Sequence, residues 1–277
     1  MNTDNPPAWQ LLMPFGVLKF LDRKRAFEHI HVVGRAPWRA ALSRPLRTML
    51  VLSRLEFVPS DILQRPDMVV DVGANVGHWS EAVLTLVAPR QIIAVEPDPT
   101  AFAQLQARLG GRPNVRLLQV AVGAENGQAP FHVMHNSQWS SLLPVRQQDV
   151  REHYVGNADV KVLREVQTVS VDVRRLDDLL RDVPAITLLK VDIQGGEMAL
   201  LDGAAETLAR TRAVMLETNF VSHYDGDALF DTLHERMTRE FGFHLHRYAR
   251  PTYGVEGGDG RLLYADAVYV NDSFGKR

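Results

Sequence analysis

The sequence contains no cysteine, and that absence excludes several chemistries. Disulfide bonds, thiol nucleophiles and cysteine-ligated zinc or iron–sulfur sites all require this residue. The histidines offer no replacement, because they show no H-E-x-x-H or related zinc-binding spacing. A chain without disulfides suits a reducing compartment, and we expect the protein to act in the cytoplasm.

Neither sign of charge predominates, and no apolar run is long enough to cross a bilayer. Lys and Arg number 31 against 33 Asp and Glu, so we expect no general electrostatic affinity for nucleic acid. The apolar stretch at 9–21 contains Pro14 and Lys19 and is well short of the roughly 20 residues that a membrane span needs. We expect a helix here that packs on the main domain or on a second copy of the chain. A helix lying on a membrane surface is the less favoured alternative.

The composition of the 277-residue chain, 45% hydrophobic and 23% charged, is typical of a globular protein with a sizeable core. Prolines at 37, 45, 59 and 66 divide the first part of the chain into short helical segments. We therefore predict an N-terminal helical extension over residues 1–65 and one α/β domain over 66–277.

After Pro66, strand-like and helical segments alternate, which predicts a mostly parallel sheet with helical crossovers. The predicted strands are 68–70, 91–95, 115–120, 186–192, 214–217 and 264–270, and the predicted helices are 78–87, 101–109, 197–209 and 229–241. Two further strands, 131–134 and 167–171, interrupt this order and predict a hairpin-like insertion over about 125–175. The glycine-containing loop 250–261 is long enough to act as a lid.

Two motifs follow the first two predicted strands: Asp71-Val72-Gly73-Ala74-Asn75-Val76-Gly77 and Glu96-Pro97-Asp98. Ligands of open parallel sheets bind beyond the carboxyl ends of the strands, and an acid about 20 residues after a glycine turn can accept hydrogen bonds from a ribose. The turn lacks the second glycine of G-x-G-x-x-G, and no Gly-Lys-Ser/Thr follows it. It therefore suits a nucleoside better than a chain of phosphates, and S-adenosylmethionine is the common cofactor of that kind. A tight turn that binds no ligand is the alternative.

Together with a third motif, Lys190-Val191-Asp192-Ile193-Gln194-Gly195-Gly196-Glu197, these residues resemble the FkbM family of S-adenosylmethionine-dependent methyltransferases. The resemblance covers roughly residues 66–271 and includes Ser140-Ser141-Leu142 and the strand that ends in Glu217. Gln194 departs from the family pattern Lys-x-Asp-x-Glu-Gly-x-Glu, which has glutamate there. The resemblance implies a Rossmann-like class I methyltransferase fold, with a mostly parallel seven-stranded sheet and helices on both faces. It also implies O-methylation of a sugar, a glycan or a secondary metabolite.

The resemblance further implies a cofactor site built from the loops after the first three strands and from the insertion. Gly73, Asn75 and Gly77 would surround the methionine part of S-adenosylmethionine, and Glu96 would hold its ribose. Asp98 and the Ala121-Val122 turn would border the adenosine. The wider expected set also contains Asp71, Ala74, Pro97, Ser141 and Asp192.

The expected catalytic group is a general base for the acceptor hydroxyl, because an alcohol is a poor nucleophile. Asp192 is the first candidate, since it ends the central strand at the cofactor cleft. His223 is the second, because imidazole titrates near neutral pH. Lys190 lies on the same strand face as Asp192 and could pair with Asp192 or with Glu197. A purely structural Lys–Asp–Glu cluster that closes the turn is the alternative for these residues.

The sequence predicts no metal site, because the oxygen-bearing side chains Asp192, Glu217 and Asn219 are too few and lack a metal-specific spacing. Two alternatives to O-methylation stay open: methylation of a nitrogen or a carboxylate, and a non-catalytic binding protein with the cofactor fold. No Asn-Pro-Pro-Tyr motif is present, which counts against nucleobase or glutamine methylation. We therefore expect a small-molecule or glycan acceptor and no nucleic acid, with residues 1–65 available for self-association.

Overall fold

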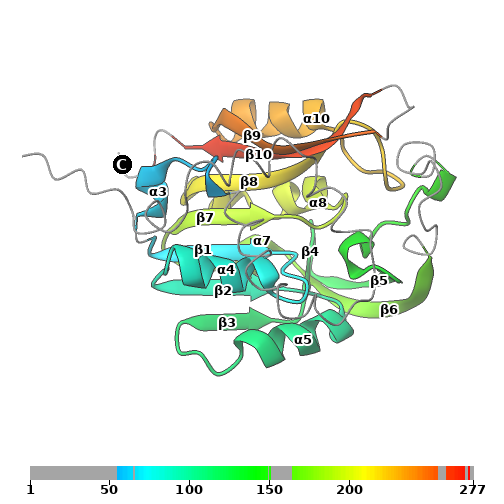
Figure 1. Cartoon of the computed structure of the whole chain (residues 1–277), viewed down its shortest axis with the longest axis horizontal. Coiled ribbons are helices and arrows are strands. Elements are labelled where there is room, and N and C mark those ends of the chain that lie inside the picture. Colours follow the sequence, from blue (N-terminus) through cyan, green and yellow to red (C-terminus); the bar gives the residue numbers. More distant parts are fainter. Residues whose placement is uncertain are drawn as a thin grey trace, which may run out of the picture. The chain divides into compact units, whose positions relative to one another are not determined.

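The computed structural model describes residues 55–64, 66–148, 150, 164–254, 260–271 and 274. Their main element is a seven-stranded sheet in the order β3-β2-β1-β7-β8-β10-β9 (Figure 1). Its strands are β1 (Met68–Val72), β2 (Gln91–Val95), β3 (Val115–Leu118), β7 (Ile186–Val191), β8 (Thr211–Asn219), β9 (His244–Tyr253) and β10 (Leu262–Val270). Only β10 runs antiparallel to its neighbours in this described sheet, pairing with β8 and β9. The predicted mostly parallel, Rossmann-like sheet is therefore confirmed.

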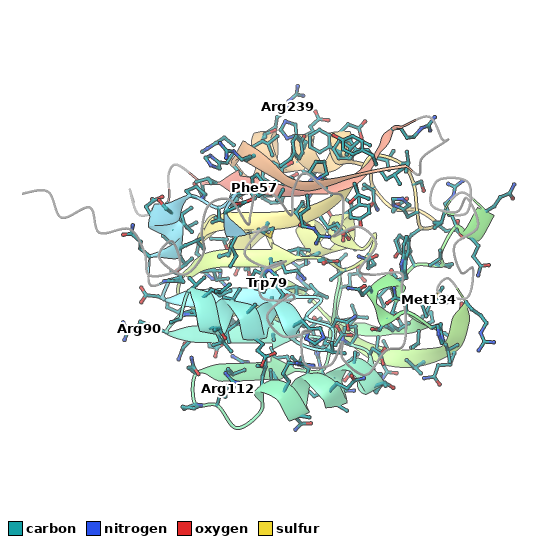
Figure 2. All side chains as sticks on the ribbon, viewed as in Figure 1. Phe57, Trp79, Arg90, Arg112, Met134 and Arg239 are labelled. Atoms are coloured by element: carbon teal, nitrogen blue, oxygen red, sulfur yellow. The ribbon has the colours of Figure 1, made fainter. Side chains whose placement is uncertain are left out.

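Helices cover both faces of this sheet, as predicted, because its central strands are apolar on both sides. One face carries α3 (Ser60–Leu63), α4 (His78–Leu86) and α5 (Pro99–Leu109). The other face carries α7 (Leu176–Leu179), α8 (Glu197–Asp202), α9 (Ala205–Ala209) and α10 (Phe230–Glu235). The last of these continues into the π-helical turn η5 (Arg236–Glu240). Adjacent residues of β1 point to opposite faces. Val69 joins the cluster of Trp79 on α4, which Figure 2 labels, and Val70 joins that of Leu200 on α8.

The predicted insertion contributes two strands to a second, three-stranded sheet in the order β4-β6-β5, and β4 comes just before the insertion. The strands of this sheet are β4 (Ala121–Val122), β5 (Gly127–Met134) and β6 (Glu165–Arg174), and a short 3-10 helix, η3 (Ser137–Trp139), follows β5. β5 and β6 pair antiparallel, which confirms the hairpin-like pair expected from the sequence. In Figure 1 these two strands lie at the end of the main sheet that is away from α3. The insertion therefore stands beside one end of the main sheet rather than on its face.

Several expectations fall partly or wholly outside the described residues. Of the predicted extension 1–65, only 55–64 is described, and there Leu55, Val58 and Ile62 are buried against the sheet. The division at residue 65 thus stays a prediction. Of the predicted lid 250–261, residues 255–259 lie outside the description, and 250–253 belong to β9. No helix in the described ranges is both long and apolar enough to cross a membrane.

Two strands were not predicted from the sequence: β4, where Ala121-Val122 was expected as a turn, and β9. β9 mixes histidine and arginine with Leu245, Tyr248 and Ala249, and it contains Pro251. These are the residues that typically occur on an edge strand, where charged side chains and proline discourage further pairing. Because β9 is at the edge of the sheet, its polar composition made it resemble a loop.

Candidate active site

The loop between β1 and α4 presses against the loop after β7. The N–H groups of Gly73 and Ala74 both donate to the carbonyl of Val95, each at 3.0 Å, so the loop is fixed on the end of β2. Gly73 has a φ of +79°, and a Cβ there would stand 1.8 Å from the carbonyl oxygen of Asp192. Only glycine permits this approach. The first glycine of the motif therefore brings the predicted cofactor loop next to the predicted base.

Glu96 lies at the end of β2, directly beside this loop. Its carboxyl group accepts hydrogen bonds from the N–H of Asn75 at 2.7 Å and from the N–H of Asp98 at 2.8 Å. The side chain is buried, and that burial raises its pKa from 4.5 to about 7. Each carboxyl oxygen keeps a further lone pair for a ligand hydroxyl. The structure thus brings together Glu96 and the glycine loop, as the sequence predicts.

An apolar pocket opens next to Glu96. Its lining includes Val95 and Pro97 from the end of β2, Ala121 and Val122 of β4, and Phe131 and Leu142 of the insertion. Gly73 and Ile193 also line it, so the pocket reaches both loops. The predicted residues Pro97, Ala121 and Val122 therefore lie together in the lining of one apolar pocket.

Two polar residues of the predicted cofactor set lie where the fold itself uses them. Asp71 is fully buried beneath the loop, where it accepts a hydrogen bond from Ser80 at 2.6 Å and pairs with Lys190 at 3.2 Å. Asp98 is the N-cap of α5, and its Oδ1 accepts the N–H of Thr100 at 2.8 Å. Capping bonds of this kind stabilise helix ends. Both residues therefore stabilise the structure around the site and do not line the pocket.

The insertion is joined to both loops by serine hydroxyls. Ser137 donates to Oδ1 of Asn75 at 3.1 Å, and Ser141 donates to the backbone carbonyl of Gln194 at 2.7 Å. Ser141 also accepts the N–H of Leu143 at 3.0 Å. The predicted residue Ser141 therefore fixes the insertion against the loop that follows β7.

Lys190 and Asp192 form the charged centre of the site. The Lys190 ammonium lies 3.2 Å from Asp71 and 3.3 Å from Asp192, and it donates to the carbonyl of Gly73 at 3.2 Å. Lys190 is almost fully buried, whereas the side chain of Asp192 is 20% exposed. Of the two expected partners for Lys190, the structure shows Asp192. Of the two carboxylates beside Lys190, Asp192 is therefore the one that is partly exposed to solvent.

The other two predicted catalytic residues are buried away from solvent. Glu197 begins α8 and accepts the N–H of Ile193 at 3.1 Å, and burial raises its pKa from 4.5 to about 7. His223 has its N–H bonded to Asp227, and its ring meets the rings of Trp139 and Tyr264 edge to face. Glu197 therefore closes the loop after β7, and His223 packs in an aromatic wall.

The site also contains residues for which the sequence predicted no role, above all Gln194 and Tyr224. The Gln194 amide nitrogen lies 2.8 Å from Oδ1 of Asp192 and 2.6 Å from Oε2 of Glu217, and Tyr224 donates to its amide oxygen at 2.7 Å. The available signal for Gln194 was its departure from the family motif. Tyr224 follows His223 in a loop without a recognisable pattern, so nothing in the sequence pointed to it. Within the described ranges, no cluster of three or more His, Cys, Asp or Glu side chains could hold a metal ion.

The chain is similar to several known methyltransferases. The model of the methyltransferase FkbM domain matches residues 71–245. The chain is 31% identical over 172 residues to the 2-O-methyltransferase NoeI of Sinorhizobium fredii, covering 60% of this chain and 69% of that one. It is 30% identical over 152 residues to Methyltransferase 1 of Beauveria bassiana, covering 52% of this chain and 61% of that one. The solved structure of a magnesium protoporphyrin IX methyltransferase from Synechocystis aligns with a TM-score of 0.45 and 11% identity, over 98% of this chain and 100% of that one. The family match spans more than half of the sequence and both loops of the site, and the chain therefore belongs to the FkbM family of methyltransferases.

Proposed function

We propose that this methyltransferase uses S-adenosylmethionine and transfers its methyl group to a hydroxyl of a sugar, a glycan or a secondary metabolite. The observation that carries the proposal is the partly exposed Asp192 carboxylate, which pairs with Lys190 beside the glycine loop and accepts a hydrogen bond from Gln194. The named activity of the relative NoeI, a 2-O-methyltransferase, supports a hydroxyl acceptor.

The residues around the glycine loop fit an adenosine. A nucleoside needs an acceptor for its two ribose hydroxyls and an apolar slot for its base. Glu96 offers the acceptor, because its carboxyl oxygens face the loop and keep lone pairs beyond those used by Asn75 and Asp98. The pocket beside it, between Pro97, Ala121 and Phe131, offers the slot. The same loop has too few glycines for a pyrophosphate.

The proposed role of Asp192 is to take the proton of the acceptor hydroxyl. When bound, S-adenosylmethionine supplies a methyl group on a positively charged sulfur, which leaves as a neutral thioether. Asp192 can act as base because part of its carboxylate is exposed while Lys190 and Gln194 fix the orientation of its two oxygens. The Gly73 approach holds the two loops together, so the base is aligned with the cofactor loop. His223, the other candidate, is 2% exposed.

Binding calorimetry tests the cofactor. We expect S-adenosylmethionine and S-adenosylhomocysteine to bind the wild type, and NAD, as the control, not to bind. Glu96→Ala should lose about 1.5–3 kcal/mol of binding free energy, the value of hydrogen bonds to a charged group. If neither S-adenosylmethionine nor S-adenosylhomocysteine binds, the cofactor assignment is refuted. The alternative of a non-catalytic binding protein would then remain.

Turnover tests the acceptor and the base. The enzyme is incubated with S-adenosylmethionine and a panel of methyl glycosides, and S-adenosylhomocysteine is quantified as product. Asp192→Asn should lower turnover at least about tenfold while S-adenosylhomocysteine still binds with wild-type affinity. An active Asp192→Asn enzyme would remove Asp192 as the base. If the enzyme methylates amines or carboxylates and none of the glycosides, the acceptor is a nitrogen or a carboxylate, and the proposed hydroxyl acceptor is wrong.

A further inference from the structure

Gln194 joins the two carboxylates at the ends of the adjacent parallel strands β7 and β8. Its amide nitrogen lies 2.8 Å from Asp192 and 2.6 Å from Glu217, within hydrogen-bond reach of both. An amide nitrogen carries two hydrogens, so one side chain can donate one to each carboxylate. All three side chains are partly exposed. This bridge therefore lies at the border between the buried centre of the site and the surface that a substrate can reach.

The orientation of this amide is determined by its surroundings. Ionised carboxylates only accept hydrogen bonds, so the amide nitrogen must face Asp192 and Glu217, and the amide oxygen must face away. The hydroxyl of Tyr224 donates to that oxygen at 2.7 Å, from a side chain that is only 1% exposed. The Tyr224 ring reaches this position because the neighbouring residue is Gly195, where a Cβ would stand 3.0 Å from it. A reversed amide would lose both hydrogen bonds to the carboxylates and would place its oxygen against them.

The backbone of Gln194 is held as firmly as its side chain. It has a φ of +59°, in the left-handed region that residues other than glycine rarely adopt. Its carbonyl accepts the hydroxyl of Ser141 at 2.7 Å, which ties it to the insertion. A strained backbone held by several contacts is a feature that clusters at functional sites. Gln194 thus connects β7, β8, the insertion and the loop that carries Tyr224.

Charge explains why a neutral donor suits this position. Charged groups around Asp192 include the Lys190 ammonium on β7, the Glu217 carboxylate on β8, which contacts the same Gln194 amide, and Glu197 on α8. Lys190 is also shared with Asp71, so negative charge already predominates here. Glutamate at position 194 would add a third carboxylate at the contacts of 2.6 and 2.8 Å and would remove both donated hydrogens. Glutamine supplies the donors without any charge.

We propose that Gln194 is a positioning residue, whose amide holds Asp192 in the orientation in which it accepts the proton of the acceptor hydroxyl. This proposal rests on the proposed function, in which Asp192 is the base. Through the same amide, the orientation of Asp192 depends on Glu217 and on Tyr224. Gln194 itself does not take part in the transfer.

A charge-balanced pair of variants separates positioning from folding. Gln194→Glu removes both donated bonds and adds a charge. The double variant Gln194→Glu with Glu217→Gln restores the wild-type net charge and allows residue 217 to donate to residue 194, but Asp192 has lost its donor. Glu217→Gln alone measures the cost of changing that residue. The midpoint of thermal unfolding is measured for the wild type, the two single variants and the double variant. For the same four proteins, kcat and KM are measured with the glycoside that accepts the methyl group.

If Gln194 positions Asp192, the double variant should regain most of the thermal stability that Gln194→Glu loses, while its kcat stays about tenfold to a hundredfold below wild type at an unchanged KM. A role limited to folding predicts that stability and kcat recover together, and that result would overturn the proposal.

A second measurement needs no acceptor. The 13C resonance of the Asp192 carboxyl carbon, assigned with Asp192→Asn, is followed against pH in the wild type and in the double variant. Loss of a donor to the ionised form should move its titration to higher pH, and an unchanged titration would count against positioning. If the wild type binds S-adenosylhomocysteine but methylates no glycoside, the acceptor assignment fails while this titration still decides the role of Gln194.

Discussion

Replacing Gly73 with alanine tests the contact on which the site depends most. The Cβ would stand 1.8 Å from the Asp192 carbonyl oxygen, so the two loops must separate by about 1 Å before it fits. The positive φ of +79° adds about 1–2 kcal/mol of strain, and the forced movement of packed groups adds about 1–3 kcal/mol. We expect Gly73→Ala to lose about 2–5 kcal/mol of unfolding free energy in urea denaturation. A displacement of this size at the base should also lower turnover by about a hundredfold.

Gly111 provides a matched control. Its φ is +78°, nearly the same as that of Gly73, but a Cβ there would meet no atom within 4 Å. Gly111→Ala should therefore show the backbone strain alone, about 1–2 kcal/mol, with wild-type turnover and wild-type affinity for S-adenosylhomocysteine. The difference between the two variants isolates the loop contact. Equal losses of stability, with full turnover in both, would refute the idea that this contact aligns the site.

Three further predictions concern the buried acids. Burial raises the pKa of Glu96 to about 7, and ribose hydroxyls donate best to its ionised form. The affinity for S-adenosylhomocysteine, measured by calorimetry, should therefore fall about fivefold from pH 7 to pH 6 in the wild type and stay constant in Glu96→Gln. Asp98→Ala should cost about 1 kcal/mol of stability through loss of the helix cap at unchanged ligand affinity, whereas weaker binding would place Asp98 at the adenosine. The pKa of Glu197 is raised from 4.5 to about 7, so its contribution to stability is complete below pH 4.5 and is lost by about pH 7. Urea denaturation at pH 4.5 and pH 7 measures how far the unfolding free energy falls across this range. The fall should be smaller by up to about 3 kcal/mol in Glu197→Gln than in the wild type. Equal falls in the two proteins would show that Glu197 does not titrate in this range.

The features that could be predicted from the sequence are those set by local pattern. The continuous apolar run of β1 predicts a strand buried on both faces, and the glycine turn after it predicts a ligand loop. The spacing from Asn75 to Glu96 is likewise a consequence of one strand–helix–strand unit, which places the end of β2 beside the end of β1. The contact of 2.7 Å between the two residues follows from that unit. β9 escaped prediction because edge strands carry polar residues that remove the apolar signal.

The features that could not be predicted depend on contacts between distant segments. Gln194 meets Glu217 and Tyr224, which are 23 and 30 residues away, only because β8 lies beside β7 and the loop after β8 folds back over it. Ser137 of the insertion and Asn75 of the glycine loop are 62 residues apart in the sequence, yet their side chains are hydrogen-bonded. No spacing rule relates such positions, since the intervening loops can have any length.

Burial divides the acids of the motifs into two kinds that their spacing cannot distinguish. Asp71 and Asp192 both occur at the carboxyl ends of central strands, and both pair with Lys190. Asp71 is within β1 and fully buried, so its charge serves to hold Lys190 in place. Asp192 follows the last residue of β7, and its side chain is 20% exposed to solvent. Val72 pairs with Val191, so the two strands end at the same level, with Asp71 one residue before that end and Asp192 one residue after it. The different burial of the two acids therefore follows from their positions relative to the strand ends, which only the pairing along the sheet reveals.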